Sequence, residues 1–272
     1  MIAWLRLLVI ALCILAMTVI LAPVQLVVMR FFRPLSRKLP MIWHRITLRL
    51  IGTRVHVTGQ RPGHRPLLIV ANHVSWSDIL ILGSVMELCF IAKAEVRSWP
   101  GISVLAILQR TVFVDRDRRH DSANQANTIA ARLGEGDAMV LFAEGTTGDG
   151  TRVGPFKSAL FGAAQAALRD SHLEAVTIQP VALAYTRLFG MPLGRFHQDR
   201  ASWPGDVALG PHLLRYLLHG AYDVEVVLAP TLEFTRESGR KQIAAATHAR
   251  VRTAFATAMR MRAPQPGDAR QA

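Results

Sequence analysis

The feature that most restricts the fold of this chain is a series of short, continuous apolar runs. They are rich in Val, Ile, Leu and Phe, and most do not alternate with polar residues as half-buried strands do. Runs of this kind are typical of β-strands that are covered on both faces. We therefore predict strands at residues 55–57, 67–71, 88–92, 111–115, 139–143, 176–185 and 224–229.

Stretches with helical character lie between these runs. Alternation of strands and helices predicts an α/β fold with a mixed, largely parallel sheet flanked by helices. This main domain is expected to cover residues 51–262, and the last ten residues, 263–272, are expected to be a disordered tail. The predicted helices are residues 77–86, 102–109, 121–133, 157–168, 211–219 and 241–262.

Residues 1–29 are expected to form a membrane anchor. Between Leu7 and Met29 the chain carries no charged residue, and this length is enough to cross a hydrocarbon core about 30 Å thick. A cleaved signal peptide is one alternative, although no clear small-x-small cleavage site follows. Pro23 leaves a second alternative open, in which a kinked or re-entrant helix lies in one leaflet.

Residues 30–50 are predicted to form a basic helix at the membrane interface. Arg30, Arg33, Arg37 and Lys38 follow the apolar run directly, and aromatic residues interleave with them. Because basic residues stay on the cytoplasmic side of a membrane, they predict a protein of a bacterial-type inner membrane whose main domain faces the cytoplasm. The alternative is an ordinary helix face in contact with solvent.

Composition narrows the class of partner. The 272 residues carry a net charge of +13, and 51% of them are hydrophobic, which suits an anionic surface such as a membrane or a nucleic acid. Few aromatic residues accompany the basic ones after residue 50, so a nucleic acid is not expected as a partner. A tethered protein that binds anionic lipid without catalysis remains an alternative.

Three polar segments lie at the ends of predicted strands. NHVSWSD follows residues 67–71, DRDRR ends the run near residue 115, and EGTTGDG follows the run near residue 140. In open α/β sheets, ligands gather beyond the carboxyl ends of the strands. Strands that deliver polar residues to one edge of the sheet therefore predict a functional site there.

His73 and Asp78 lie five positions apart in the first segment. On one continuous helix they would point about 140° apart, so they meet only if a turn precedes the helix. Ser75 or Ser77 is the expected helix cap, and Ser75 would supply that turn. The carboxylate would then fix the tautomer of a general base. The alternative is a structural histidine beside an aspartate that favours the helix dipole. Neither has His or Cys companions at metal-ligand spacing, so no metal site is predicted.

NHVSWSD resembles the NHxxxxD signature of the glycerolipid acyltransferases, the family that includes the 1-acylglycerol-3-phosphate acyltransferases. Three further blocks follow in the family's order. TVFVDR resembles the second block, LFAEGTTGDG the third, usually written FPEGTR, and VTIQPVALAY the fourth, with an internal Pro180. The resemblance implies an enzyme that moves a fatty acyl group from a thioester to the hydroxyl of a lysolipid.

The resemblance also implies roles for single residues. His73 would take the proton of the acceptor hydroxyl while Asp78 holds its ring, and the activated thioester makes a Ser or Cys nucleophile unnecessary. Arg116 would bind the phosphate of the acceptor through a charge-assisted fork. The other expected acceptor-site residues are Glu144, Gly145, Thr146 and Thr147, with Arg152 and Lys157 as helpers.

The third block departs from the family pattern at two positions. Ala143 replaces a proline, and Thr147 replaces an arginine that assists phosphate binding, a contact of about 1.5–3 kcal/mol. The EGTTGDG form, and SWPGD at residues 202–206, are similar to a branch that contains lyso-ornithine lipid acyltransferases, which acylate a 3-hydroxyacyl chain on ornithine. We expect 1-acyl-sn-glycerol-3-phosphate as the acceptor, giving phosphatidic acid, with lyso-ornithine lipid, giving ornithine lipid, as the alternative.

No cofactor is expected. The co-substrate implied by the resemblance is an acyl thioester of either acyl carrier protein or coenzyme A, and a basic surface would suit the acidic carrier. The expected partners are therefore membrane lipids, the lysolipid acceptor and the thioester donor.

Overall fold

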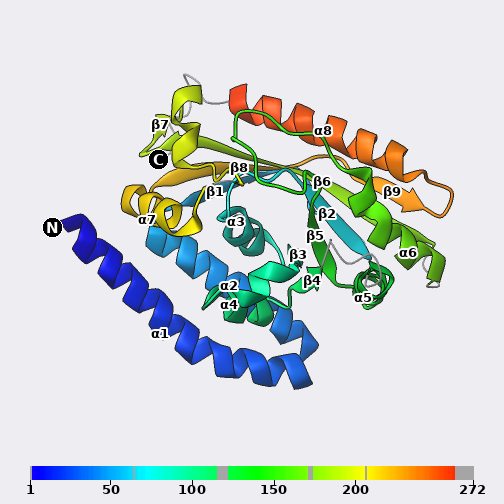
Figure 1. Ribbon diagram of the computed structural model, residues 1–272, viewed down its shortest axis with the longest axis horizontal. Helices are drawn as coiled ribbons and strands as arrows, with labels where there is room; N and C mark the ends of the chain where they lie inside the picture. Colours follow the sequence, from blue (N-terminus) through cyan, green and yellow to red (C-terminus); the bar gives the residue numbers. More distant parts are fainter. Residues whose placement is uncertain (1, 64, 115–121, 171–173, 206, 261–272) are drawn as a thin grey trace.

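A mixed β-sheet with helices on both faces forms the centre of the molecule (Figure 1). The computed structural model describes residues 2–63, 65–114, 122–170, 174–205 and 207–260. The predicted α/β class, with a largely parallel sheet and an apolar N-terminal helix, is confirmed. The tail predicted at residues 263–272 lies outside the described residues.

Within the described residues, the sheet is parallel apart from the strands that pair antiparallel with β6 (Ala175–Leu188). Antiparallel to β6 run β7 (Met191–Pro192), β8 (Tyr222–Leu228) and β9 (Leu232–Thr235). The strand order is β1-β8-β6-β2-β5-β3-β4, and β7 and β9 lie off this path. The remaining strands are β1 (Arg54–Thr58), β2 (Leu67–Ala71), β3 (Cys89–Lys93), β4 (Val112–Val114) and β5 (Ala138–Phe142).

Two of these strands were not predicted. β7 has two residues, and β9 alternates apolar and polar side chains, so neither gives a continuous apolar run. β6 is longer than predicted because it continues pairing with β8 as far as Leu188. The other predicted strands agree with the structure to within two residues at each described end.

Strand β2 shows how the sheet divides the core into two layers. Leu67, Ile69 and Ala71 pack in one cluster, and Leu68 and Val70 pack in the other. Helices α2 (Arg33–Ile51), α3 (Asp78–Val85) and α7 (Leu209–His219) contribute to the first layer, and α5 (Ser122–Gly134), α6 (Gly162–Asp170) and α8 (Arg240–Arg260) to the second. The smaller elements are α4 (Ile102–Leu108), η1 (Ala94–Ser98), η2 (Ser158–Phe161) and η3 (Arg195–Arg200).

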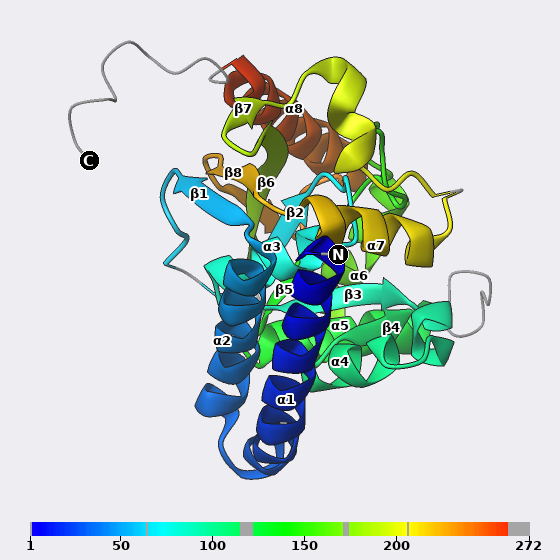
Figure 2. The same ribbon diagram turned by 90° about the vertical axis from the view of Figure 1, so that its left-hand side faces the viewer.

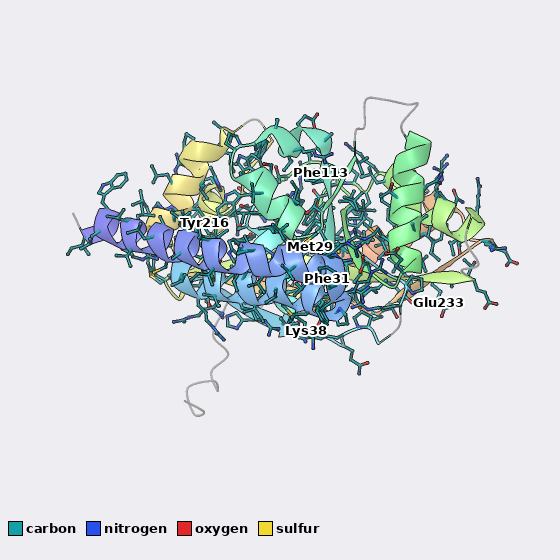
Figure 3. All side chains as sticks on the ribbon, turned by 90° about the horizontal axis from the view of Figure 1, so that it is seen from below. Met29, Phe31, Lys38, Phe113, Tyr216 and Glu233 are labelled. Carbon is teal, nitrogen blue, oxygen red and sulfur yellow. The ribbon has the colours of Figure 1, made fainter. Side chains whose placement is uncertain are left out.

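Helix α1 (Ile2–Phe31) lies antiparallel to α2 along the outside of the domain (Figure 2 and Figure 3). It is long and apolar enough to cross a membrane, with a mean hydropathy of 2.9. Every third or fourth residue is turned towards the domain, which leaves a wide apolar face exposed. The inward residues are Leu7, Ile10, Ile14, Thr18, Leu21, Gln25 and Val28.

Helix α2 is the basic segment predicted at residues 30–50. Its buried residues include His44 and Leu48, and it packs against α3, where a Cβ added to Gly83 would meet the His44 ring. Its outer face carries exposed basic residues such as Lys38 and Arg49. One side of α2 thus belongs to the core, while the role of its other side at a membrane stays a prediction.

Candidate active site

The first and third polar segments lie side by side at the carboxyl ends of β2 and β5. The Ala143 amide donates to the Ala71 carbonyl at 3.3 Å, and the Gly148 amide donates to the His73 carbonyl at 2.8 Å. The two strands are parallel neighbours, so their ends meet at one edge of the sheet. The second polar segment, with Arg116, lies outside the described residues.

His73 and Asp78 are in direct contact. His73 Nδ1 lies 2.8 Å from Asp78 Oδ2; the aspartate is fully buried, and the histidine side chain is 17% exposed. The Asp78 carboxylate accepts this bond, so Nδ1 carries the proton and Nε2 keeps its lone pair. The pair therefore has the arrangement of a general base with an orienting acid.

The turn before α3 is made differently from the prediction. Ser77 occupies the N-cap position without a capping bond, and the buried Ser75 hydroxyl has no partner among the described residues. Instead, Asp78 Oδ2 accepts the backbone amides of Val74 at 2.6 Å and Ser75 at 2.9 Å. The predicted serine cap was wrong, because the Ser77 hydroxyl bonds the Tyr185 hydroxyl instead of an amide of the helix.

Tyr185, on β6, completes the environment of Asp78. Its hydroxyl donates to Asp78 Oδ1 at 2.7 Å and, having a single hydrogen, must accept from the Ser77 hydroxyl at 2.6 Å. Burial and the nearby Asp78 raise the pKa of Tyr185 well above its usual value, so it remains a donor. Sequence patterns did not single out Tyr185; the only signal was a tyrosine in an otherwise apolar run.

Phe142, the last residue of β5, is a second neighbour that the sequence did not reveal. Its ring stacks on the His73 imidazole, with centroids 3.8 Å apart and planes 11° apart. Asp78 holds one edge of the imidazole and Phe142 covers one face. Together they restrict the ring to one orientation, with Nε2 on the edge away from Asp78.

Glu144 connects the third segment to His73. Its Oε1 accepts the His73 backbone amide at 3.2 Å, and its carboxylate also accepts the Gly154 amide. Burial raises the pKa of Glu144 to about 7, against the opposing effect of these two bonds. A Cβ at Gly154 would lie 2.8 Å from Glu144 Oε2, so a larger residue there would displace this carboxylate.

The remaining predicted acceptor-site residues follow Glu144 along the same loop. Gly145 has a φ of +75°, in the left-handed region that glycine adopts readily. Thr147 is buried, whereas the side chains of Thr146, Arg152 and Lys157 are exposed. The structure thus brings the loop of Glu144 to His73, while the role of each of these residues in binding an acceptor stays a prediction.

The SWPGD segment packs against both motif loops. The Trp203 amide donates to the Val74 carbonyl at 2.8 Å, and a Cβ at Gly205 would lie 3.0 Å from Thr146 Oγ1. This segment, distant in sequence, therefore forms part of the wall around the candidate site. Its last residue, Asp206, lies outside the described residues.

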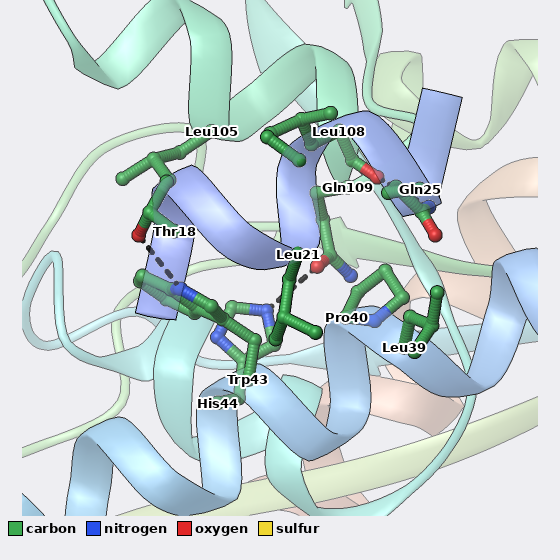
Figure 4. A pocket seen from close by; sticks show the side chains of 11 residues that line it. Thr18, Leu21, Gln25, Leu39, Pro40, Trp43, His44, Leu105, Leu108 and Gln109 are labelled. Carbon is green, nitrogen blue, oxygen red and sulfur yellow. Dashed lines mark hydrogen bonds between the residues drawn. The ribbon is translucent and has the colours of Figure 1, made fainter. Parts of the chain in front are cut away.

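A small cavity between α1, α2 and α4 is separate from this site (Figure 4). Apolar residues such as Leu21 and Leu105 line it, and His44 Nε2 lies 2.7 Å from Gln109 Oε1 at its wall. Burial lowers the pKa of His44 to about 4, so this histidine is neutral. None of the motif residues lines the cavity, and the described residues contain no cluster of three or more side chains suited to a metal ion.

Comparison with known proteins identifies the family. The family model described as Acyltransferase matches residues 53–184. A lyso-ornithine lipid O-acyltransferase of Brucella abortus is 48% identical over 259 residues, which cover 95% of this chain and 97% of the relative. The chain belongs to the acyltransferase family.

Two further comparisons agree with this assignment. A lyso-ornithine lipid O-acyltransferase of Rhizobium meliloti is 42% identical over 262 residues, or 96% of this acyltransferase and 90% of the relative. The crystal structure of the 1-acyl-sn-glycerophosphate acyltransferase of Thermotoga maritima has a TM-score of 0.64 at 20% identity, and the match covers 97% of this chain and 100% of that one. This structural similarity shows that the two proteins share a fold.

Proposed function

We propose that this acyltransferase moves a fatty acyl group from a thioester to the hydroxyl of a lyso-ornithine lipid, giving ornithine lipid. The carrying observation is the similarity to two relatives of that name over more than nine tenths of the chain. The sequence patterns favoured a lysophosphatidate acceptor, and the comparisons support the stated alternative better.

Position 147 supports the same acceptor. A lysophosphatidate carries a terminal phosphomonoester, for which the family uses an arginine that is Thr147 here. An acceptor whose reacting hydroxyl lies on a 3-hydroxyacyl chain has no such group to neutralise. A buried threonine at this position therefore suits the ornithine-linked acceptor better than a phosphate.

The geometry around His73 supports direct transfer. The free Nε2 takes the proton of the acceptor hydroxyl as its oxygen bonds to the thioester carbonyl carbon. Asp78 steadies the resulting imidazolium through Nδ1. When the carbon–sulfur bond breaks, the imidazolium returns the proton to the leaving thiolate. The donor is a thioester of acyl carrier protein or coenzyme A, and no cofactor takes part.

The two ends of α1 support attachment to one leaflet. Arg6 donates to the carbonyls of Ile51 and Leu218, and Gln25 donates to those of Ser36 and Leu108. A helix tied to the domain near both ends lies along it, with its apolar face against the membrane. The domain, with the basic face of α2, then sits on the cytoplasmic surface.

Acyl transfer by the purified protein in detergent tests the proposal. Wild-type protein is given lyso-ornithine lipid or lysophosphatidate with either thioester, beside His73→Gln and, as a matched control, the half-buried His219→Gln. We expect lyso-ornithine lipid to be preferred and His73→Gln to lose about 10²–10⁴-fold in kcat while the control keeps its rate. Transfer to lysophosphatidate alone would overturn the acceptor, and equal rates in the two variants would remove His73 as the base.

A further inference from the structure

Three large apolar side chains outside α1 are exposed within one stretch of eight residues. Phe189 is 60% exposed, Met191 67% and Phe196 94%. Phe189 lies in the turn between β6 and β7, Met191 begins β7, and Phe196 lies in η3. Single exposed apolar residues are common, so this tip cluster, defined as these three residues, needs support from other observations.

The backbone at Phe189 is the first such observation. Leu188 pairs with Met191, so Phe189 and Gly190 are the two central residues of a hairpin turn, with φ of +53° and +77°. Both values belong to the turn type in which Asn-Gly or Asp-Gly is favoured. A phenylalanine in this left-handed conformation is disfavoured, and its exposed ring gives the fold little packing in return. Such an outlier points to a role outside the fold.

The charge around the tip cluster is the second observation. Between residues 187 and 200 the chain carries Arg187, Arg195 and Arg200 against a single acid, Asp199. Arg195 is exposed in the same short helix as Phe196. Exposed aromatic rings beside basic side chains are typical of surfaces that enter the headgroup region of an anionic membrane.

The third observation is the position of the turn relative to α1. The Phe189 amide donates to the Ala221 carbonyl at 2.9 Å, and the preceding Gly220 lies against the Arg6 guanidinium. Arg6 stands near the start of α1, beside the exposed Trp4. β7 and the N-terminal end of α1 accordingly lie on the same side of the molecule (Figure 1 and Figure 2).

We propose that the tip cluster is a second membrane contact, whose aromatic and methionine side chains enter the same anionic leaflet as α1. The proposal rests on the membrane attachment proposed above. A single helix leaves the domain free to roll about the helix axis, whereas a second contact to one side of that axis restricts this rolling. The tip cluster therefore orients the enzyme on the lipid surface.

Site-specific labelling of the full chain tests the contact. Cys13 is exposed on α1 and Cys89 is buried, so a fluorophore on native Cys13 reports on α1. In a Cys13→Ser background, Phe189→Cys reports on the tip cluster, and Val57→Cys, on edge strand β1 at 37% exposure, is the control. The labelled proteins are bound to phosphatidylglycerol vesicles that carry a nitroxide just below the headgroups. We expect quenching about fivefold stronger at position 189 than at position 57.

The labelled sites distinguish the proposed contact of the tip cluster from the proposed attachment of α1 to the membrane. Quenching at Cys13 but not at position 189 would overturn the second contact and leave the attachment by α1 intact. Quenching at neither site would overturn the attachment itself. An effect at position 189 that requires added acyl carrier protein instead of lipid would show a protein partner there and would also overturn the proposal.

A stability measurement tests the reasoning about the turn. Phe189→Asn places a residue that tolerates positive φ at the same point, so its Tm should equal or exceed that of the wild type. This result would show that the fold does not need Phe189. A clear fall in Tm would show that the ring serves the fold, and the proposal would lose its first observation.

Discussion

The residues around His73 each restrict it through a different kind of contact. Asp78 fixes the imidazole tautomer, Phe142 fixes the plane of the ring, and Glu144 fixes the backbone amide. Asp78 is itself saturated, because its two oxygens accept from the imidazole, two backbone amides and Tyr185. The His73 ring is thus held in one position by its neighbours, as the proposed role of a general base requires.

Tyr185→Phe should lower kcat by about tenfold with little change in KM, because Asp78 loses the hydrogen bond to its Oδ1 and is held less firmly against His73. The matched control is Tyr222→Phe, whose hydroxyl donates to the Arg200 carbonyl. A Tyr185→Phe variant with an unchanged kcat would show that Tyr185 only fills space.

Glu144→Gln should make stability less dependent on pH. The pKa of Glu144 is about 7 in the fold against an ordinary 4.5, so the folded state keeps a proton that the unfolded state loses between these values. The free energy of unfolding therefore falls as pH rises from 4.5 to 7 and stays lowered above 7.

Unfolding by denaturant at pH 5 and pH 8 measures this effect. The free energy of unfolding of Glu144→Gln should exceed that of the wild type by about 1–3 kcal/mol at pH 8. This difference should become smaller towards pH 5. The exposed Glu233→Gln is the matched control and should track the wild type. An equal difference at both pH values would contradict the proposed ionisation of Glu144.

At the scale of elements, the contacts of α1 and the ends of the parallel strands decide the layout. β2 and β5 end beside each other and deliver two motif loops to one edge. α1 lies along α2 because Arg6 and Gln25 tie it near both ends. To cross a bilayer away from the domain, α1 would have to break both sets of bonds.

An N-terminal epitope tag should therefore lie on the same side of the membrane as the domain. Protease added to inside-out vesicles should remove the tag and digest the domain together, and sealed right-side-out vesicles should protect both. Cleavage of a surface loop of the domain serves as the internal control for the sidedness of the vesicles. A tag cut only in right-side-out vesicles would show a membrane-spanning α1.

At the scale of the whole molecule, α1 and α2 share the core of the catalytic domain. Ile10 and Leu48 belong to the same buried cluster as the strand residues beneath His73, and α1 closes the cavity beside His44. The apolar N-terminal helix therefore packs into the core of the domain and covers part of it.

Deletion of residues 2–31 should consequently destabilise the domain as well as release it from the membrane. The loss of buried apolar contacts should lower Tm by about 5 °C or more and promote association through the uncovered face of α2. Differential scanning fluorimetry and size-exclusion chromatography in detergent would measure both effects. A monomeric truncated chain with an unchanged Tm would show that α1 is only an appended anchor.

Local patterns in the sequence predicted much of this protein. Continuous apolar runs located the central strands, and β2 begins and ends at the predicted residues. The order of the four motif blocks indicated the acyltransferase family, and contact between His73 and Asp78 was predicted on the condition that a turn precedes the helix. These features depend on residues that lie close together in the chain or on a pattern that is read along it.

Only the tertiary structure revealed which residues surround His73 and Asp78. Tyr185 and Asp78 are 107 positions apart and meet because β6 pairs with β2, and Phe142 reaches the imidazole because β5 pairs with β2 on its other side. The inward-facing side of α1 was equally hidden, since apolar residues are spread around the whole helix. Strand order and helix docking depend on the packing of the whole core, so no local pattern carries them.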